Sequence, residues 1–204
     1  MIKNGRQFGT SLQDIRADHI ERYRFAVRIA EQSCEDGPPI GTVLDVGAGT
    51  GYGAYLMAQR GYAATAVEID AAAHAHGEQH FAHPGVQRLN CDVREMLPGV
   101  YDMTTCFEVL EHVDDPVELL GAIQSPRQLL ISSVPNEVVV PFDAPGTHRD
   151  HKRHFTPAEF QALLAAAGYD IVEMGSQRDK IGVGAQVRRG DTGGRTLVAV
   201  CRAL

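Results

Sequence analysis

Residues 43–53 decide the fold, and they read Val43-Leu44-Asp45-Val46-Gly47-Ala48-Gly49-Thr50-Gly51-Tyr52-Gly53. The first four are typical of a short buried strand. The alternating glycines that follow permit a sharp turn and a close approach of the backbone to a ligand. A helix predicted from about Gly53 to Arg60 would start with unpaired backbone N–H groups beside this turn. Ligands bind at the carboxyl ends of the strands in an open α/β sheet, so we expect a binding site here.

Strands and helices alternate along the rest of the chain. The patterns predict helices at 15–34, 53–60, 71–82, 116–123 and 156–167, and strands at 42–46, 63–69, 86–89, 101–107, 128–134, 169–174 and 196–202. Such alternation implies a mostly parallel sheet with helices on both faces. No helix separates the last two strands, so we expect them to pair antiparallel at one edge. The predicted fold is α/β and Rossmann-like, a doubly wound seven-stranded sheet, mostly parallel with an antiparallel last strand.

The 204 residues suit a single domain, 1–204, with an N-terminal helical cap at 1–36 and substrate-side loops at 135–155 and 176–195. A formal net charge of -7 disfavours nonspecific binding to a phosphate backbone, although the basic stretch 148–154 keeps nucleic acid open as a partner. No apolar run approaches the roughly 20 residues of a membrane span, and the first residues lack the apolar core of a signal peptide. We therefore expect a cytoplasmic protein without a membrane partner. The oligomeric state stays open.

Acidic residues follow the next two predicted strands. Glu68 ends the second strand, 17 residues after Gly51, where a carboxylate can accept hydrogen bonds from both hydroxyls of a ribose. Asp92 follows the third strand, where it can accept from an adenine amino group beside the backbone N–H of Val93. A nicotinamide-dependent oxidoreductase is the rival interpretation, but its G-x-G-x-x-G spacing fits these glycines less well.

Together these segments resemble the class I S-adenosylmethionine-dependent methyltransferases over about residues 20–175. The resemblance is carried by residues 45–51, by Val67-Glu68-Ile69-Asp70, by Cys91-Asp92-Val93 and by Tyr101-Asp102. It implies that S-adenosylmethionine is the cofactor, with its methionine part at the glycine turn, its ribose on Glu68 and its adenine on Asp92. The expected cofactor-binding residues are Asp45, Gly47, Ala48, Gly49, Gly51, Glu68, Ile69, Asp92, Val93 and Phe107.

A second cluster follows the fourth predicted strand. One helical turn would bring Glu108, Glu111 and His112 to a common point. Two carboxylates and an imidazole suit a divalent cation such as Mg²⁺, Mn²⁺ or Fe²⁺. The Glu-x-x-Glu-His string resembles ubiquinone-biosynthesis O-methyltransferases and small-RNA 3′-terminal 2′-O-methyltransferases. The latter resemblance, continued at Pro135-Asn136 and 150–156, implies His151 as a fourth metal ligand.

Three roles for this cluster stay open: a metal site, metal-free catalysis or substrate binding, and a structural role. The candidate catalytic residues are Glu108, Glu111, His112 and His151. We expect methyl transfer to a hydroxyl oxygen of a small-molecule acceptor, with metal assistance as one option. The alternatives are 2′-O-methylation at an RNA end and, from a different class, a cofactor-binding module without catalysis. The histidines of 74–83 are expected on a solvated helix surface.

Overall fold

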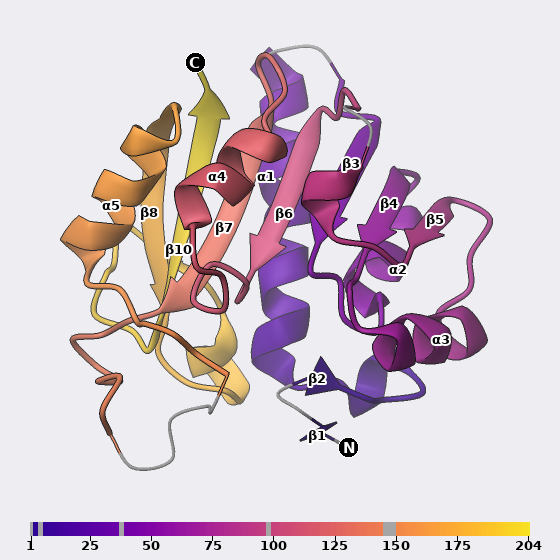
Figure 1. Cartoon of the computed structure of the whole chain (residues 1–204), viewed down its shortest axis with the longest axis horizontal. Coiled ribbons are helices and arrows are strands. Elements are labelled where there is room, and N and C mark those ends of the chain that lie inside the picture. Colours follow the sequence, from indigo (N-terminus) through magenta and orange to yellow (C-terminus); the bar gives the residue numbers. More distant parts are fainter. Residues whose placement is uncertain (1, 4–5, 37–38, 97–98, 145–149) are drawn as a thin grey trace.

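The computed structural model describes residues 2–3, 6–36, 39–96, 99–144 and 150–204. Its main sheet has the strand order β5-β4-β3-β6-β7-β10-β8-β9 (Figure 1). The strands are β3 (Thr42–Val46), β4 (Ala63–Val67), β5 (Val86–Leu89), β6 (Met103–Phe107), β7 (Leu129–Pro135), β8 (Tyr169–Gln177), β9 (Arg188–Arg189) and β10 (Thr196–Ala203). Two short strands, β1 (Ile2–Lys3) and β2 (Arg6–Gln7), form a separate antiparallel pair.

The helices lie between these strands in the order that the sequence predicts. They are α1 (Ala17–Asp36), α2 (Tyr52–Ala58), α3 (Ala71–His80), α4 (Pro116–Ala122) and α5 (Pro157–Ala166). The described residues also form three short 3₁₀ helices, which are η1 (Leu12–Asp14), η2 (Val93–Glu95) and η3 (Gly182–Ala185). Thr156 caps α5 through the predicted capping box with Glu159.

The sheet confirms the predicted class and corrects its details. Strands β5, β4, β3, β6 and β7 are parallel, and β10 pairs antiparallel with β8 as expected. Within this pairing, β10 lies between β7 and β8, and β9 lies at the edge beyond β8. The sheet also has eight strands instead of seven, because Arg188 and Arg189 pair with Ser176 and Gly175. The predicted loop 176–195 therefore contributes its first and middle residues to the sheet.

Two apolar layers sandwich the sheet. Helix α1 lies behind it and helices α4 and α5 in front in Figure 1. Alternate residues of β3 point to opposite layers: Val43 joins the cluster with α1 and α2, whereas Leu44 and Val46 join the cluster with α4 and α5. Burial on both faces fixes the register of β3, since a one-residue slip would exchange its two faces.

Asp102 explains where two strands begin. Its carboxylate accepts hydrogen bonds from the amides of Gly41 and Thr42 and from the Thr42 hydroxyl, at 2.8 to 2.9 Å. The residue therefore ties the start of β3 to the start of β6, and β6 begins at Met103 rather than at Tyr101 as predicted. Within the described part of the chain, no helix combines the length and apolar character needed to cross a membrane.

Gly53→Ala tests the packing of α1 on α2, and Gly121→Ala in α4 is its control. A Cβ on Gly53 would lie 2.0 Å from the Tyr23 ring, whereas a Cβ on Gly121 in α4 has nothing within 4 Å. Gly53→Ala should lower the free energy of unfolding by about 1–3 kcal/mol through overpacking. Gly121→Ala should raise it by up to about 1 kcal/mol, since alanine favours helix. Urea denaturation of both variants measures the effects, and equal shifts would contradict the packing described.

Candidate active site

A cleft of about 960 Å³ opens at the carboxyl ends of β3, β4 and β6. This is the position expected for a ligand site in an open α/β sheet. Most of the predicted cofactor-binding residues line it: Gly47, Ala48, Gly49, Glu68, Ile69, Asp92, Val93 and Phe107. Asp45 and Gly51 are not among its lining residues. All four candidates of the second cluster line the same cleft: Glu108, Glu111, His112 and His151.

The glycine turn takes a backbone shape that other residues rarely adopt. Gly47, Gly49 and Gly51 have φ values of +63°, +58° and +73°. A Cβ on Gly47 would meet the Val109 side chain at 2.5 Å, whereas a Cβ on Gly49 would meet nothing within 4 Å. The Gly49 backbone therefore borders open space, where a ligand can approach it closely.

Glu68 is the acceptor that holds this turn in place. Its side chain is only 4% exposed. One carboxylate oxygen accepts from the Gly49 amide at 2.8 Å. The other accepts from the Asp70 amide at 2.8 Å and from the Arg6 guanidinium at 3.0 Å. Glu68 thus connects β4, the glycine turn and the N-terminal segment at one wall of the cleft.

The N-terminal segment crosses the glycine turn near Glu68. The Thr50 hydroxyl donates to the Gln7 carbonyl at 3.0 Å. His76 on α3 lies 2.8 Å from the Gly9 carbonyl, and its ring contacts Phe8 edge to face. His76 therefore packs against this segment, so the expectation of a solvated surface for it is wrong.

Asp45 lies beneath the cleft rather than in its wall. It is fully buried, and it accepts hydrogen bonds from Tyr23 at 3.0 Å and Thr105 at 2.8 Å. Tyr23 itself lines the cleft and packs edge to face on Phe107. Burial raises the pKa of the Asp45 carboxyl to about 7, although the hydrogen bonds from Thr105, Tyr23 and the Ala54 amide favour the ionised form.

Asp92 also lines the cleft, at the start of η2. Its carboxylate accepts from the Arg94 amide at 3.0 Å and pairs with the Arg94 guanidinium. The hydrogen bonds from Arg94 hold the pKa of Asp92 below its usual value. The lowered pKa favours the ionised form of this side chain in the cleft.

Glu108 begins the second cluster with a strained backbone. Its φ of +55° falls in the left-handed region, which non-glycine residues rarely occupy. Its amide donates to the Ser133 carbonyl, and its carboxylate accepts from the Ser133 hydroxyl at 2.9 Å. Strain of this kind concentrates at functional sites.

Glu111 is fully buried, yet neither of its carboxylate oxygens has a hydrogen-bond partner in another described residue. Burial, and next the charge of Glu108, raise the pKa of Glu111 well above its ordinary value. A buried carboxylate without partners costs free energy, so a missing ligand is the physical explanation that fits its position.

Glu111, His112 and His151 form a group in which one possible ligand atom from each lies within 4.8 Å of the others. The rings of His112 and His151 meet edge to face, with centroids 4.7 Å apart. The structure brings these three predicted residues together and leaves Glu108 outside the group, on Ser133. His148 lies outside the described residues.

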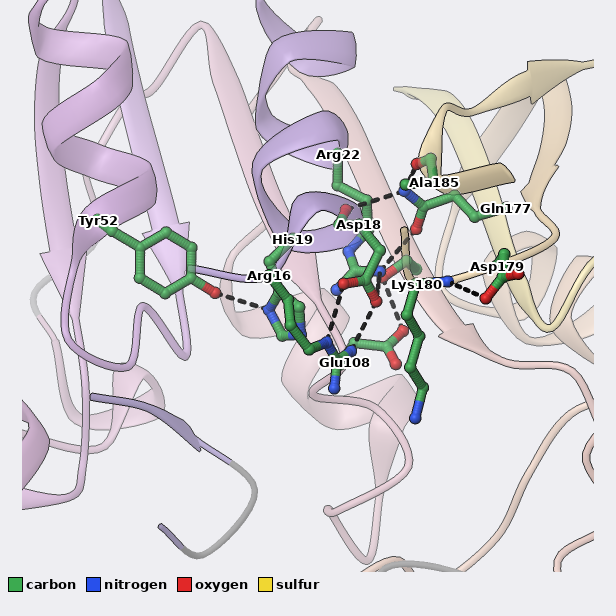
Figure 2. A network of polar contacts seen from close by, with 11 residues as sticks. Arg16, Asp18, His19, Arg22, Tyr52, Glu108, Gln177, Asp179, Lys180 and Ala185 are labelled. Atoms are coloured by element: carbon green, nitrogen blue, oxygen red, sulfur yellow. Dashed lines mark hydrogen bonds and ion pairs between the residues drawn. The ribbon is translucent and has the colours of Figure 1, made fainter. Parts of the chain in front are cut away.

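A polar network at the start of α1 lies beside Glu108, and the sequence analysis did not predict it. Arg16 pairs with Asp18 at 2.6 Å, and the buried Arg22 donates to Gln177 of β8 at 2.6 Å. Figure 2 shows Arg16 and Lys180 gathered beside Glu108. All of these residues line the cleft. The sequence feature that could have predicted this network is the i, i+4 spacing of Asp18 and Arg22 on the buried face of α1.

Comparisons with known proteins agree with this geometry. A family model described as methyltransferase domain matches residues 17–174. The ubiquinone biosynthesis O-methyltransferase of Pseudomonas paraeruginosa is 29% identical over 154 residues, which cover 65% of this chain and 66% of that protein. The match thus spans just under two thirds of that relative's length.

Solved structures show the same fold. The 1,6-didemethyltoxoflavin-N1-methyltransferase of Burkholderia thailandensis, with bound 1,6-didemethyltoxoflavin and S-adenosylhomocysteine, has a TM-score of 0.61 and 28% identity, covering 89% of this chain and 78% of that chain. A SAM-dependent methyltransferase of Thermotoga maritima has a TM-score of 0.64 and 18% identity, covering 90% and 91% of the two chains.

Asp45 should make the stability of the protein depend on pH. Its pKa rises from the model-peptide value of 3.8 to about 7 on folding. Ionisation therefore disfavours the folded state, and the free energy of unfolding should fall as pH rises from about 4 to about 7, by up to about 4 kcal/mol. Asp45→Asn cannot ionise and should lack this loss. Urea denaturation at pH 5 and pH 8 tests it, and identical pH dependence in variant and wild type would contradict the assignment.

Proposed function

The chain belongs to the methyltransferase domain family, and on that premise we propose that it transfers the methyl group of S-adenosylmethionine to a hydroxyl oxygen of a small-molecule acceptor, assisted by a divalent cation. The observation that carries the proposal is the position of Glu111. This buried carboxylate lacks partners among the described residues and lies beside His112 and His151. It lines the same cleft as the glycine turn and Glu68.

The glycine-turn wall suits the cofactor. Glu68 offers two carboxylate oxygens, one of which already holds the turn through Gly49. The other is held by Arg6 and Asp70, and ribose hydroxyls would exchange with Arg6 there. The open space at Gly49 suits the methionine part, because any side chain at that position would enter it. Asp92 and Val93 line the same cleft, and we assign the adenine to them.

The second cluster suits the reaction. Glu111, His112 and His151 would hold a divalent cation, and imidazole nitrogens with a carboxylate favour Mn²⁺ or Fe²⁺. Such an ion lowers the pKa of a bound hydroxyl and orients its oxygen. Glu108 accepts from Ser133 and lies beside Arg16 (Figure 2), and there it would border the acceptor. The residues therefore orient the acceptor and prepare it to lose a proton.

Two observations favour methyl transfer to an oxygen of a small molecule over the alternatives. The relative from Pseudomonas paraeruginosa is named for O-methylation in ubiquinone biosynthesis. A 2′-hydroxyl at an RNA end would use the same three residues, but the net charge of -7 opposes contact with a long phosphate backbone. RNA binding would reveal itself by affinity that falls steeply with added salt.

Gly49→Ala should separate cofactor binding from folding. The added Cβ meets no protein atom within 4 Å, but it enters the space proposed for the methionine part. Gly190→Ala is the matched control, because Gly190 also has a positive φ and open space around its Cβ. Both should lose about 1–2 kcal/mol of stability from backbone strain. Only Gly49→Ala should weaken S-adenosylhomocysteine binding at least tenfold by calorimetry; equal affinities would refute the placement.

Glu111→Gln should separate stability from activity. The substitution keeps the volume and removes a buried carboxyl whose ionisation burial disfavours, so the metal-free protein should be at least as stable as wild type. Methyl transfer should fall by at least about 100-fold, and wild-type activity should be lost with a chelator and restored by Mn²⁺. Glu31→Gln on the exposed side of α1 is the control. Activity that ignores chelator and survives Glu111→Gln would sink the metal proposal.

A further inference from the structure

His154 is a buried histidine outside the group of Glu111, His112 and His151, and its side chain is 2% exposed. The segment that carries it is anchored to the end of β7. Phe155 donates its amide to the Pro135 carbonyl, and its own carbonyl accepts from the Glu137 amide at 2.9 Å. The His154 ring also packs edge to face on Phe142, with centroids 5.6 Å apart. Its position is therefore fixed by backbone and by packing.

Two hydrogen bonds hold this ring between the Val140 carbonyl and His151. Nδ1 of His154 lies 2.6 Å from the Val140 carbonyl oxygen. Nε2 of His154 lies 2.8 Å from Nδ1 of His151. The three groups form a chain that runs from a backbone carbonyl through one imidazole to the next.

When both rings are neutral, the hydrogen-bond partners set where each proton sits. A carbonyl oxygen can only accept, so Nδ1 of His154 carries the hydrogen. In the neutral ring Nε2 is then the acceptor, and it receives the Nδ1–H of His151. The neutral His151 ring consequently keeps its lone pair on Nε2, the nitrogen that is not turned toward His154.

His112 is arranged in the same way. Its Nδ1 lies 3.0 Å from the Asp150 carbonyl oxygen, so this nitrogen donates and the lone pair is on Nε2. Metal-binding histidines characteristically donate their other ring N–H to a carbonyl, carboxylate or similar acceptor, which fixes the tautomer and the ring orientation. For His112 the acceptor is backbone, whereas for His151 it is the side chain of His154.

We infer that His154 is a positioning residue that holds His151 as its Nδ1–H tautomer, so that Nε2 of His151 serves as the ligand atom beside Glu111 and His112. The inference rests on the metal role in the proposed function. His154 itself does not touch the ion or the acceptor. Its contribution is to fix the proton and the ring plane of a ligand before a cation arrives.

Two variants of His154 test the inference. His154→Phe keeps a ring against Phe142 but removes both nitrogens, whereas His154→Gln retains an oxygen that can accept from His151. The tautomer of His151 is read from ¹⁵N–¹H correlation spectra of the metal-free protein. We expect the Nδ1–H form in wild type, loss of that form in His154→Phe, and its partial retention in His154→Gln. An Nε2–H form of His151 in wild type would overturn the inference.

Cobalt binding supplies the second readout. Titration with Co²⁺ alone, followed by visible absorption, should show affinity about 10- to 100-fold weaker in His154→Phe than in wild type, with His154→Gln between them. His80→Phe on α3 is the control for loss of a histidine elsewhere. Unchanged Co²⁺ affinity in a folded His154→Phe protein would also refute the inference. Chelator-insensitive methyl transfer would defeat the proposed metal role and the ligand role of His151, whereas the spectra of the metal-free protein decide independently whether His154 sets the tautomer.

Discussion

The hydrogen bond from the Gly49 amide to Glu68 is the constraint on which the site depends. It fixes a turn whose glycines all have positive φ, and it does so with an acid from the neighbouring strand. The turn leaves the carboxyl ends of β3, β4 and β6 uncovered, so the cleft exists because the chain folds back sharply after Val46. The second oxygen of Glu68 accepts from Arg6 and from the Asp70 amide, and in the proposed function ribose hydroxyls would take the place of Arg6 there.

The opposite wall carries features that a protein optimised for stability alone would lack. Glu108 keeps a left-handed backbone, and Glu111 is buried without a partner among the described residues. Both are unfavourable in isolation, and they occur within four residues at the end of one strand. The histidines beside Glu111 are in contrast well oriented, through Asp150 and His154. A cation between them would relieve the cost that Glu111 bears.

The sequence predicts the sheet class and the cofactor wall because both follow from local patterns. Strand Thr42–Val46, the glycines and Glu68 stand at spacings that the chain itself displays. The sequence does not predict β9, because its two residues, Arg188 and Arg189, carry no strand pattern and form a strand only by pairing with β8. The α1 network leaves only the spacing of Asp18 and Arg22 in the sequence, because the partner that Arg22 binds, Gln177, lies 155 residues away. Glu108 falls outside the group for a similar reason, since Ser133 binds it from another strand.

A crystal structure of the protein with S-adenosylhomocysteine and Mn²⁺ tests the central claim most directly. The account predicts ribose hydroxyls on Glu68 in place of Arg6, and an anomalous manganese peak bound by Glu111, His112 and His151. Nucleoside density away from Glu68, or manganese absent from these three residues at saturating concentration, would contradict it.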